Sequence, residues 1–486
     1  MTEFIIHYMA PMMFAGLIIF MIIGYPAAFS LAAVGLFFGF FAIELGVIQP
    51  QFLGNLTYQL YSVLSNELLL AIPFFTFMGV ILERCGLAED LLEGFGQLFG
   101  NVRGGLSYAV ILVGAILGAI TGTVAASVIA MGLISLPMMM KYGYNVRHAT
   151  GVIAASGTIT QLIPPSLVLI VLADALGQSP GDMYIGATGA SIVQVLLFAI
   201  WVFILSIFRP EYVPALPPEA RTLRGQALFW KCVRGMVPSL ALIAIVLGTI
   251  FMGLATPTEA GAMGVVGAMV IAAIARRLTW DLIYQGMEST MKLTAMVVFI
   301  LMGARVFSLV FQGVGGSIWI EEMLTGLPGG QVGFLIFTMI FVFIIAFFLD
   351  FFEIAFIIVP LLAPAAVALD INLIWFGVLL CANMQTSFMH PPFGFALFYL
   401  RGIAPKEVKS SDIYWGAIPW IVLQLILVGL LVAFPELVTY FLDAPVVQDL
   451  NNIQIDLPAL GGGLEGAPEM GLPALGLPPA VPAPNP

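Results

Sequence analysis

Two apolar stretches in the last third of the chain are interrupted by polar residues and prolines, where a simple membrane helix would be continuous. The first stretch, residues 348–364, contains Asp350, and the second, residues 381–402, contains Pro391-Pro392. Inside a bilayer, an opened backbone exposes N–H and C=O groups that hydrocarbon cannot satisfy, so such breaks persist only where protein or a water-filled cavity surrounds them. The two breaks therefore predict a polar site inside a membrane domain.

The same pattern occurs earlier in the chain, and a single offset of 227 residues aligns the two copies without a gap. Under this offset Thr123 matches Asp350, Pro137 matches Pro364, Thr160 matches Ser387, and Pro164-Pro165 matches Pro391-Pro392. Paired, interrupted hydrophobic segments in two halves of a chain are the best sequence indication of the midplane site of a secondary transporter. We therefore predict two homologous halves.

Composition supports an all-α polytopic membrane protein. Of the 486 residues, 61% are hydrophobic and 9% are charged, whereas soluble domains have roughly 25% charged residues. No basic patch indicates a nucleic-acid partner. Three cysteines, Cys85, Cys232 and Cys381, lie far apart in the sequence and do not indicate a disulfide framework or a metal cluster. We expect a lipid bilayer around the chain and no cofactor.

The first half is predicted to cover residues 1–208. It contains a re-entrant hairpin near residues 106–140 and a broken helix at residues 151–173. Residues 209–235 follow as a linker with the densest basic cluster of the chain. The positive-inside rule places this linker in the cytoplasm.

The second half is predicted to cover residues 236–443 and to repeat this plan. Its hairpin lies near residues 332–369 and its broken helix at residues 373–400. Residues 444–486 are rich in proline and glycine without a regular period, and such a composition is typical of a disordered tail.

The breaks supply candidate ligands for sodium ions, which need several oxygen atoms. At a broken helix these come from freed carbonyls and from hydroxyl, amide or carboxylate side chains. The candidates are Gly122, Thr123, Thr158, Thr160 and Pro164 in the first half and Asp350, Asn383, Thr386, Ser387 and Pro391 in the second. Alternatively, the hydroxyls only cap half-helices or bond back to the preceding turn, and Asp350 caps the second arm of its hairpin.

Three other residues are candidates for substrate binding. His390, at the second break, is able to hydrogen-bond a substrate or to titrate, although such a histidine is more often a satisfied interior donor. Arg305 stands alone in an apolar run, where it pairs with a substrate carboxylate or, alternatively, snorkels or pairs with a structural acid. Ser166 directly follows the first pair of prolines.

Over roughly residues 10–442 the sequence resembles the large membrane subunit of the tripartite ATP-independent periplasmic (TRAP) transporters, the DctM-like permeases. The resemblance rests on Gly104-Gly105-Leu106, Gly122-Thr123 with Ala125, Lys141-Tyr142-Gly143-Tyr144, Pro164-Pro165-Ser166, Thr256-Pro257-Thr258-Glu259-Ala260 and residues 383–394. The family often has Gly-Ser in place of Gly122-Thr123, and commonly has threonine in place of His390. Residues 385–402 are most similar to the subgroup associated with 2-oxo acids, mannitol or chloroaromatic acids.

This resemblance implies two inverted repeats in an elevator-type transporter of the bacterial inner membrane. In such a transporter a scaffold holds still while the hairpins and broken helices carry substrate and sodium across. The implied partners are a small four-helix membrane subunit and a periplasmic substrate-binding protein. Because the sequence lacks the N-terminal extension of fused members, we expect a separate small subunit. The expected function is the sodium-coupled import of a small organic acid, and no enzymatic activity is expected.

An energy estimate supports sodium coupling. Moving one charge across 100 mV involves about 2.3 kcal/mol, so importing a dianion alone into a negative cell costs about 4.6 kcal/mol. Two sodium ions cancel that charge. A stand-alone sodium or proton/carboxylate symporter of a related inverted-repeat fold is the alternative. An intramembrane hydrolase is disfavoured because Asp350 has no obvious second aspartate motif.

Overall fold

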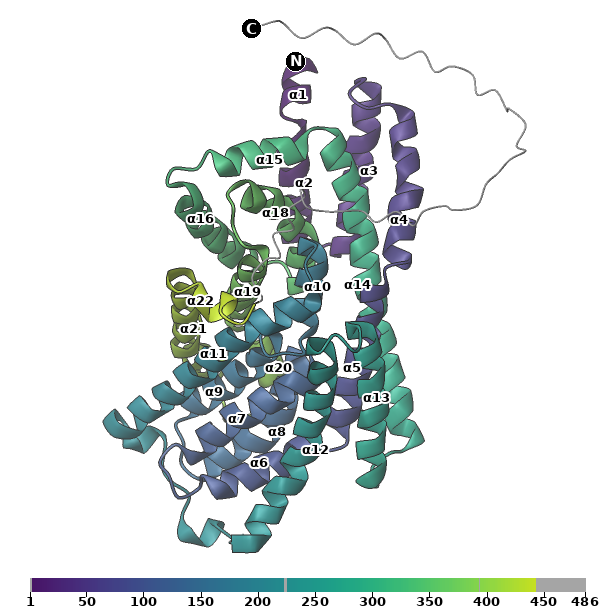
Figure 1. Ribbon diagram of the computed structural model, residues 1–486. Helices are drawn as coiled ribbons and strands as arrows, with labels where there is room; N and C mark the ends of the chain where they lie inside the picture. The colour runs from purple at the N-terminus through teal and green to yellow at the C-terminus, as the bar shows by residue number, and fades with distance from the viewer. Residues whose placement is uncertain (1, 223–224, 393, 443–486) are drawn as a thin grey trace, which may run out of the picture. The chain divides into compact units, whose positions relative to one another are not determined.

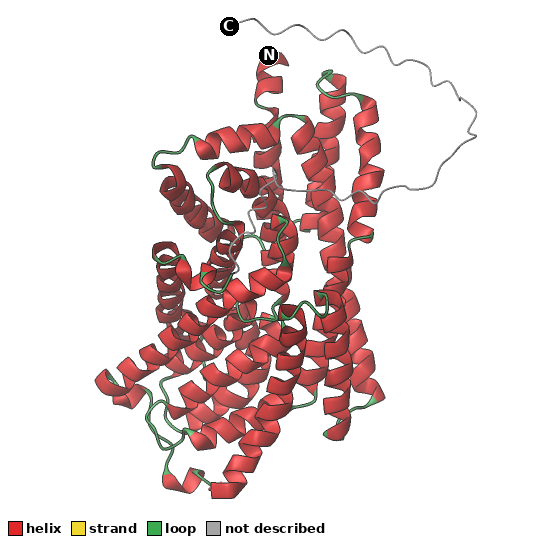
Figure 2. Cartoon of the chain, viewed as in Figure 1, coloured by secondary structure: helices red, strands yellow, loops and turns green. Residues whose placement is uncertain are grey.

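The computed structural model describes residues 2–222, 225–392 and 394–442, and every regular element in these ranges is a helix (Figure 2). Eight of these helices are long and apolar enough to cross a membrane, or up to ten spans if each of two bent helix pairs counts as one. The predicted all-α membrane fold is therefore confirmed. The predicted disordered tail, residues 444–486, lies outside the described residues.

The helices follow one another with short connections (Figure 1). Up to residue 222 they are α1 (Thr2–His7), α2 (Met9–Ile23), α3 (Ala27–Glu44), α4 (Leu56–Leu64), α5 (Ala71–Arg84), α6 (Leu87–Leu98), α7 (Gly105–Thr121), α8 (Val124–Lys141), α9 (Val146–Thr158), α10 (Leu167–Leu176) and α11 (Pro180–Phe208). From residue 225 they are α12 (Gly225–Phe251), α13 (Pro257–Ile274), α14 (Trp280–Gly313), α15 (Gly316–Thr325), α16 (Gly330–Ile345), α17 (Phe351–Glu353), α18 (Val359–Ala368), α19 (Leu373–Met384), α20 (Phe395–Ile403), α21 (Ser410–Ala433) and α22 (Glu436–Thr439).

Helices of the two halves begin at corresponding residues. α8 begins at Val124 and α17 at Phe351, and these two residues are 227 positions apart. α9 begins at Val146 and α19 at Leu373, which are separated by the same number of positions. The helices on the two sides of each hairpin break contact each other, α7 with α8 and α16 with α18. The broken helices continue through short 3-10 turns, η3 (Ile159–Gln161) and η7 (Gln385–Met389), before α10 and α20.

The second hairpin differs from the first in a π-helical turn, η6 (Ile354–Ile358), between α17 and α18. Pro360 follows this turn. Proline has no N–H to donate to a carbonyl of the preceding turn, and wider turns of this kind occur as bulges within α-helices. The position 227 residues earlier is Leu133, which keeps its N–H, and α8 runs through it without a bulge.

The basic linker is shorter than its predicted span of residues 209–235, because α12 already begins at Gly225. α12 packs on α6, where Gly94 of α6 lies against Cys232 of α12. Lys231 also forms an ion pair with Glu93 of α6, which gives that basic residue a partner within the helical layer.

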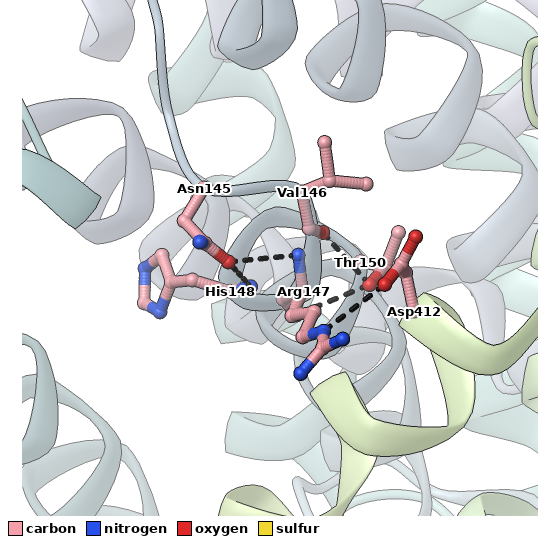
Figure 3. A network of polar contacts seen from close by, with 6 residues as sticks. All are labelled: Asn145, Val146, Arg147, His148, Thr150 and Asp412. Atoms are coloured by element: carbon pink, nitrogen blue, oxygen red, sulfur yellow. Dashed lines mark hydrogen bonds and ion pairs between the residues drawn. The ribbon is translucent and has the colours of Figure 1, made fainter. Parts of the chain in front are cut away.

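The buried helix α9 is fixed to α21 by close backbone approach and by polar contacts at its start. A Cβ atom at Gly151 would lie 2.1 Å from the carbonyl oxygen of Gly416 in α21, so the two backbones touch. Near the start of α9, the side-chain oxygen of Asn145 accepts hydrogen bonds from two backbone amides (Figure 3). There, Nε of Arg147 lies 3.0 Å from Oδ1 of Asp412 in α21 (Figure 3). At one side of the molecule, α3, α5, α13 and α14 pack together (Figure 1).

A pair of buried amides joins α11 to η7. Nε2 of Gln194 donates to Oε1 of Gln385 over 2.5 Å, and Nε2 of Gln385 donates back over 3.3 Å. Both side chains are fully buried. Each amide therefore satisfies the other inside an apolar core.

We predict that Gln385→Leu lowers the free energy of unfolding by about 1–3 kcal/mol, because it leaves a buried amide without its partner. Thermal unfolding in detergent measures this loss. The double variant Gln194→Leu/Gln385→Leu should recover most of it, since no orphaned polar group remains. Strictly additive losses in the double variant would contradict a direct interaction between the two amides.

Candidate functional site

A cleft of about 350 Å³ lies where both hairpin breaks face α14. The first break contributes Gly122 and Thr123, and the second contributes Asp350 and Glu353. α14 contributes three apolar side chains to the lining, those of Leu293, Met296 and Ile300. Two segments far apart in the sequence therefore meet at one cavity beside a long helix.

Equivalent positions of the two halves line this cleft. Five pairs of lining residues are 227 positions apart: Thr123 and Asp350, Val124 and Phe351, Ala125 and Phe352, Gln161 and Phe388, and Val168 and Phe395. The offset that aligns the sequences thus also pairs residues around one cavity. Gly122, Thr123 and Asp350 are the predicted site residues that reach the lining.

The first break is opened by backbone geometry. Gly122 ends α7 with φ +63°, in the left-handed region that favours glycine. Thr123 is extended and precedes α8, and its side chain makes no hydrogen bond that caps the helix. Because the first N–H groups of a helix carry partial positive charge, the start of α8 presents a weakly positive surface to the cleft.

At the second break, a carboxylate side chain satisfies a backbone N–H group. Oε2 of Glu353 accepts a hydrogen bond from the backbone N–H of Asp350 over 2.9 Å. The position equivalent to Glu353 in the first half is Ala126, which has no such group. The two equivalent helix starts therefore differ in charge, with two carboxylates at the second and none at the first.

The other predicted hydroxyl ligands lie buried in the broken helices and do not line the cleft. Each donates to a carbonyl of the preceding turn: Thr158 to Ala155 (2.8 Å), Thr160 to Gly157 (2.7 Å), Thr386 to Asn383 (2.7 Å) and Ser387 to Met384 (2.6 Å). All four bonds run to the third residue before the hydroxyl, and not to the fourth. Donation uses the hydrogen and leaves oxygen lone pairs for an acceptor role, so the same geometry is compatible with ion binding.

The remaining candidate ligands are an amide and two prolines. Nδ2 of Asn383 donates to the carbonyl of Met339 over 2.8 Å, which ties α19 to α16. The Pro164-Pro165 and Pro391-Pro392 peptide bonds are both cis. Pro164 and Pro391 follow the 3-10 turns η3 and η7, so their carbonyls lie in the interrupted parts of the two broken helices.

None of the three predicted substrate residues lines the cleft. Ser166 caps α10: its hydroxyl donates to the carbonyl of Gln161 over 2.5 Å and accepts from the N–H of Val168. Arg305 is exposed on α14. His390 is buried, with its ring centroid 4.1 Å from that of Phe347, and neither ring nitrogen has a hydrogen-bond partner among the described residues.

Sequence reasoning missed most of the cleft wall. Gln161 is 2% exposed and lines the cleft, and its Oε1 has no hydrogen-bond partner among the described residues. It was detectable as a polar residue inside the first break. Phe388, Phe395, Tyr399 and the α14 residues carry no such signal, because an apolar side chain facing a cleft looks like one facing lipid.

A family model described as the DctM component of the tripartite ATP-independent periplasmic transporter matches residues 14–437. The chain belongs to this family. DctM proteins are the large permease subunits of TRAP transporters, so the predicted family is confirmed, and the chain is a transporter subunit rather than an enzyme. It is a multi-pass protein of the bacterial inner membrane. The family works with a small membrane subunit and a periplasmic binding protein.

Several curated TRAP permeases are similar over most of their length. The C4-dicarboxylate permease DctM of Vibrio cholerae is 28% identical, covering 86% of this chain and 93% of that relative. The ectoine permease TeaC of Halomonas elongata is 28% identical, covering 90% and 99%. The 2,3-diketo-L-gulonate permease YiaN of Escherichia coli is 27% identical, covering 76% and 85%.

A solved transporter structure also resembles the fold. The YdaH transporter of Alcanivorax borkumensis matches with a TM-score of 0.53 at 15% identity, covering 80% of this chain and 88% of that chain. This likeness supports the transporter fold and carries no information on the substrate.

We predict that Gly122→Ala and Gly177→Ala cost similar stability but differ in their effect on transport. Both glycines end a helix at φ +63°, where a Cβ atom costs about 1–2 kcal/mol. A Cβ at Gly122 also contacts the side chain of Leu167, which lines the cleft, whereas Gly177 has open space.

Thermal unfolding in detergent and uptake by the reconstituted transporter measure the two effects. Gly122→Ala should reduce uptake well below that of Gly177→Ala at matched protein levels. Equal uptake by the two variants would argue against a role for the first break in transport.

Proposed function

We propose that this chain is the permease subunit of a secondary-active, sodium-coupled importer of a small organic acid delivered by a periplasmic binding protein. The observation that supports this best is the cleft, where equivalent positions of two helix breaks face α14. Opened backbone at the middle of a membrane domain supplies the ion and substrate sites of secondary transporters. The equivalence of the two breaks favours two ion sites of similar construction.

The proposed ion sites lie at the two breaks. The first uses Gly122, Thr123, Thr158, Thr160 and Pro164, and the second uses Asp350, Asn383, Thr386, Ser387 and Pro391, with the prolines acting through their carbonyls. Thr160 and Ser387 support this arrangement because they occupy equivalent positions and make the same hydrogen bond to the third residue before them. Their oxygen lone pairs then become available to a cation at the same place in each half.

We further propose an elevator movement, in which the hairpins and broken helices slide past a scaffold that includes α14. The cleft supports this because its lining comes both from the hairpins and broken helices and from α14. The proposed partners are a separate small four-helix membrane subunit and a periplasmic binding protein. Because His390, Arg305 and Ser166 do not line the cleft, we propose them for the path of the substrate to and from the cleft. His390 is favoured because its buried ring nitrogens lack partners among the described residues.

A first prediction tests the ion site with two hydroxyl-deleting variants. Thr160→Val should raise the sodium concentration for half-maximal uptake about tenfold, equivalent to about 1.4 kcal/mol, because one ligand is lost. Thr150→Val is the matched control, since Thr150 is buried in α9, the helix that leads into η3, and donates to the carbonyl of Val146. Sodium titrations of uptake in proteoliposomes measure both variants.

Ser387→Ala should shift the sodium response in the same direction as Thr160→Val. If both variants keep the wild-type sodium response at wild-type protein levels, these hydroxyls are helix caps and the proposed ion sites are wrong.

A second prediction concerns the partners. In proteoliposomes, this chain alone should give no uptake, and the small subunit with the liganded binding protein should restore uptake driven by a sodium gradient. Replacing external sodium by potassium or choline at constant pH should abolish that uptake. Strong sodium-driven uptake of free substrate by the single chain would instead identify a stand-alone symporter, and a response to a pH gradient would indicate proton coupling.

A further inference from the structure

The two halves of the chain contribute chemically different residues to the cleft, although these residues occupy equivalent positions. In the five lining pairs, the first half supplies small, aliphatic or uncharged polar residues: Thr123, Val124, Ala125, Gln161 and Val168. The second half supplies four aromatic rings and one acid: Asp350, Phe351, Phe352, Phe388 and Phe395. In each pair, the two equivalent positions line the same cavity but carry different types of side chain.

The first-half wall suits a single anionic or strongly polar group. The start of α8 has no side-chain cap at Thr123, so its N–H groups are open to an acceptor such as a carboxylate. Gln161 is 2% exposed, lines the cleft, and has an unpartnered Oε1 among the described residues. Because an amide side chain both donates and accepts hydrogen bonds, Gln161 is able to bind a carboxylate, an oxo group or a hydroxyl.

The second-half wall suits an apolar group and opposes a second anion. Asp350 and Glu353 stand at the start of α17, and the described lining residues include no lysine, arginine or histidine. A carboxylate placed there would meet two acids and no cationic side chain, and like charges repel. One sodium ion at the proposed second ion site would offset only one of these two negative charges. The aromatic rings of this wall, together with Leu293, Met296 and Ile300 of α14, favour an apolar body instead.

We propose that the cleft selects a monocarboxylate with an aromatic or branched apolar body and disfavours dicarboxylates. The carboxylate lies at the start of α8 and Gln161, and the apolar body lies between the second-half aromatic rings and α14. This inference rests on the proposed function, since it takes the cleft as the substrate site. It deepens that function by naming the class of organic acid.

A cysteine placed in the wall of the cleft tests this selectivity directly on the purified chain. The native cysteines Cys85, Cys232 and Cys381 are buried, so an introduced exposed cysteine is the main target for a maleimide reagent. Met296→Cys places the reporter on α14 in the cleft, at a side chain that is 43% exposed. Met263→Cys on α13 is the control, because Met263 is similarly exposed and does not line the cleft.

Labelling rates are compared in sodium chloride, sodium benzoate and sodium succinate at equal sodium concentration. Benzoate at twice its dissociation constant should slow labelling of Met296→Cys about threefold by simple occupancy. Succinate should leave the rate as in sodium chloride, and neither salt should change the rate at Met263→Cys. A gain-of-function variant, Phe395→Lys, adds a cation at a half-exposed lining position and should create protection by succinate.

Two outcomes would overturn the inference. Protection by succinate equal to that by benzoate would show a cleft without the proposed selectivity, while sodium-driven, binding-protein-dependent uptake would still support the permease function. Protection by neither acid, in the presence of sodium, would show that this cleft is not the organic-acid site. The uptake experiments with the complete assembly test the proposed function separately, so its failure is distinguishable from failure of this inference.

Discussion

The absence of water from the bilayer core is the constraint on which this structure depends, because every opened backbone group there needs a partner from the protein. The breaks in the helices satisfy their backbone groups in different ways. Glu353 accepts the N–H of Asp350 at the second hairpin, and hydroxyls bond to carbonyls in the broken helices, as Thr160 does. At the first hairpin, no side chain caps α8 at Thr123. Both hairpin breaks line the cleft, and the first of them has no side-chain cap.

The first broken helix is buried and packs tightly on its neighbour α21. Eleven consecutive residues of α9, His148 to Thr158, are buried, and α9 touches α21 along the closely approaching glycines Gly151 and Gly416. Nε2 of Gln424 in α21 donates to the hydroxyl of Thr158 over 2.9 Å. Polar contacts of this type between packed helices hold the proposed ion ligands at fixed positions, which oxygen coordination of a small cation requires.

The sequence was informative wherever a polar group or a proline stood in an apolar run. Gly122, Thr123 and Asp350 were recognisable for that reason, and all three line the cleft. Met296 and Phe395 were not, because hydrophobic residues that face lipid, core or cleft are alike in sequence. Arg305 is an isolated charge in an apolar run. The face of the helix on which such a side chain lies is not evident from the sequence, and Arg305 lies on the exposed face of α14.

The π-helical turn at Ile354–Ile358 limits how far the two halves are interchangeable. A turn closed by hydrogen bonds to the fifth residue uses more residues than an α-turn, so side chains after it lie at a different angle around the helix axis from their counterparts in α8. The equivalent lining positions on this arm accordingly end at Ala125 and Phe352, before the turn. Side chains at equivalent positions therefore leave the helix in corresponding directions before residue 354 and in different directions beyond it. For protein engineering, this turn marks the point on the second hairpin beyond which the 227-residue offset no longer predicts the direction of a side chain.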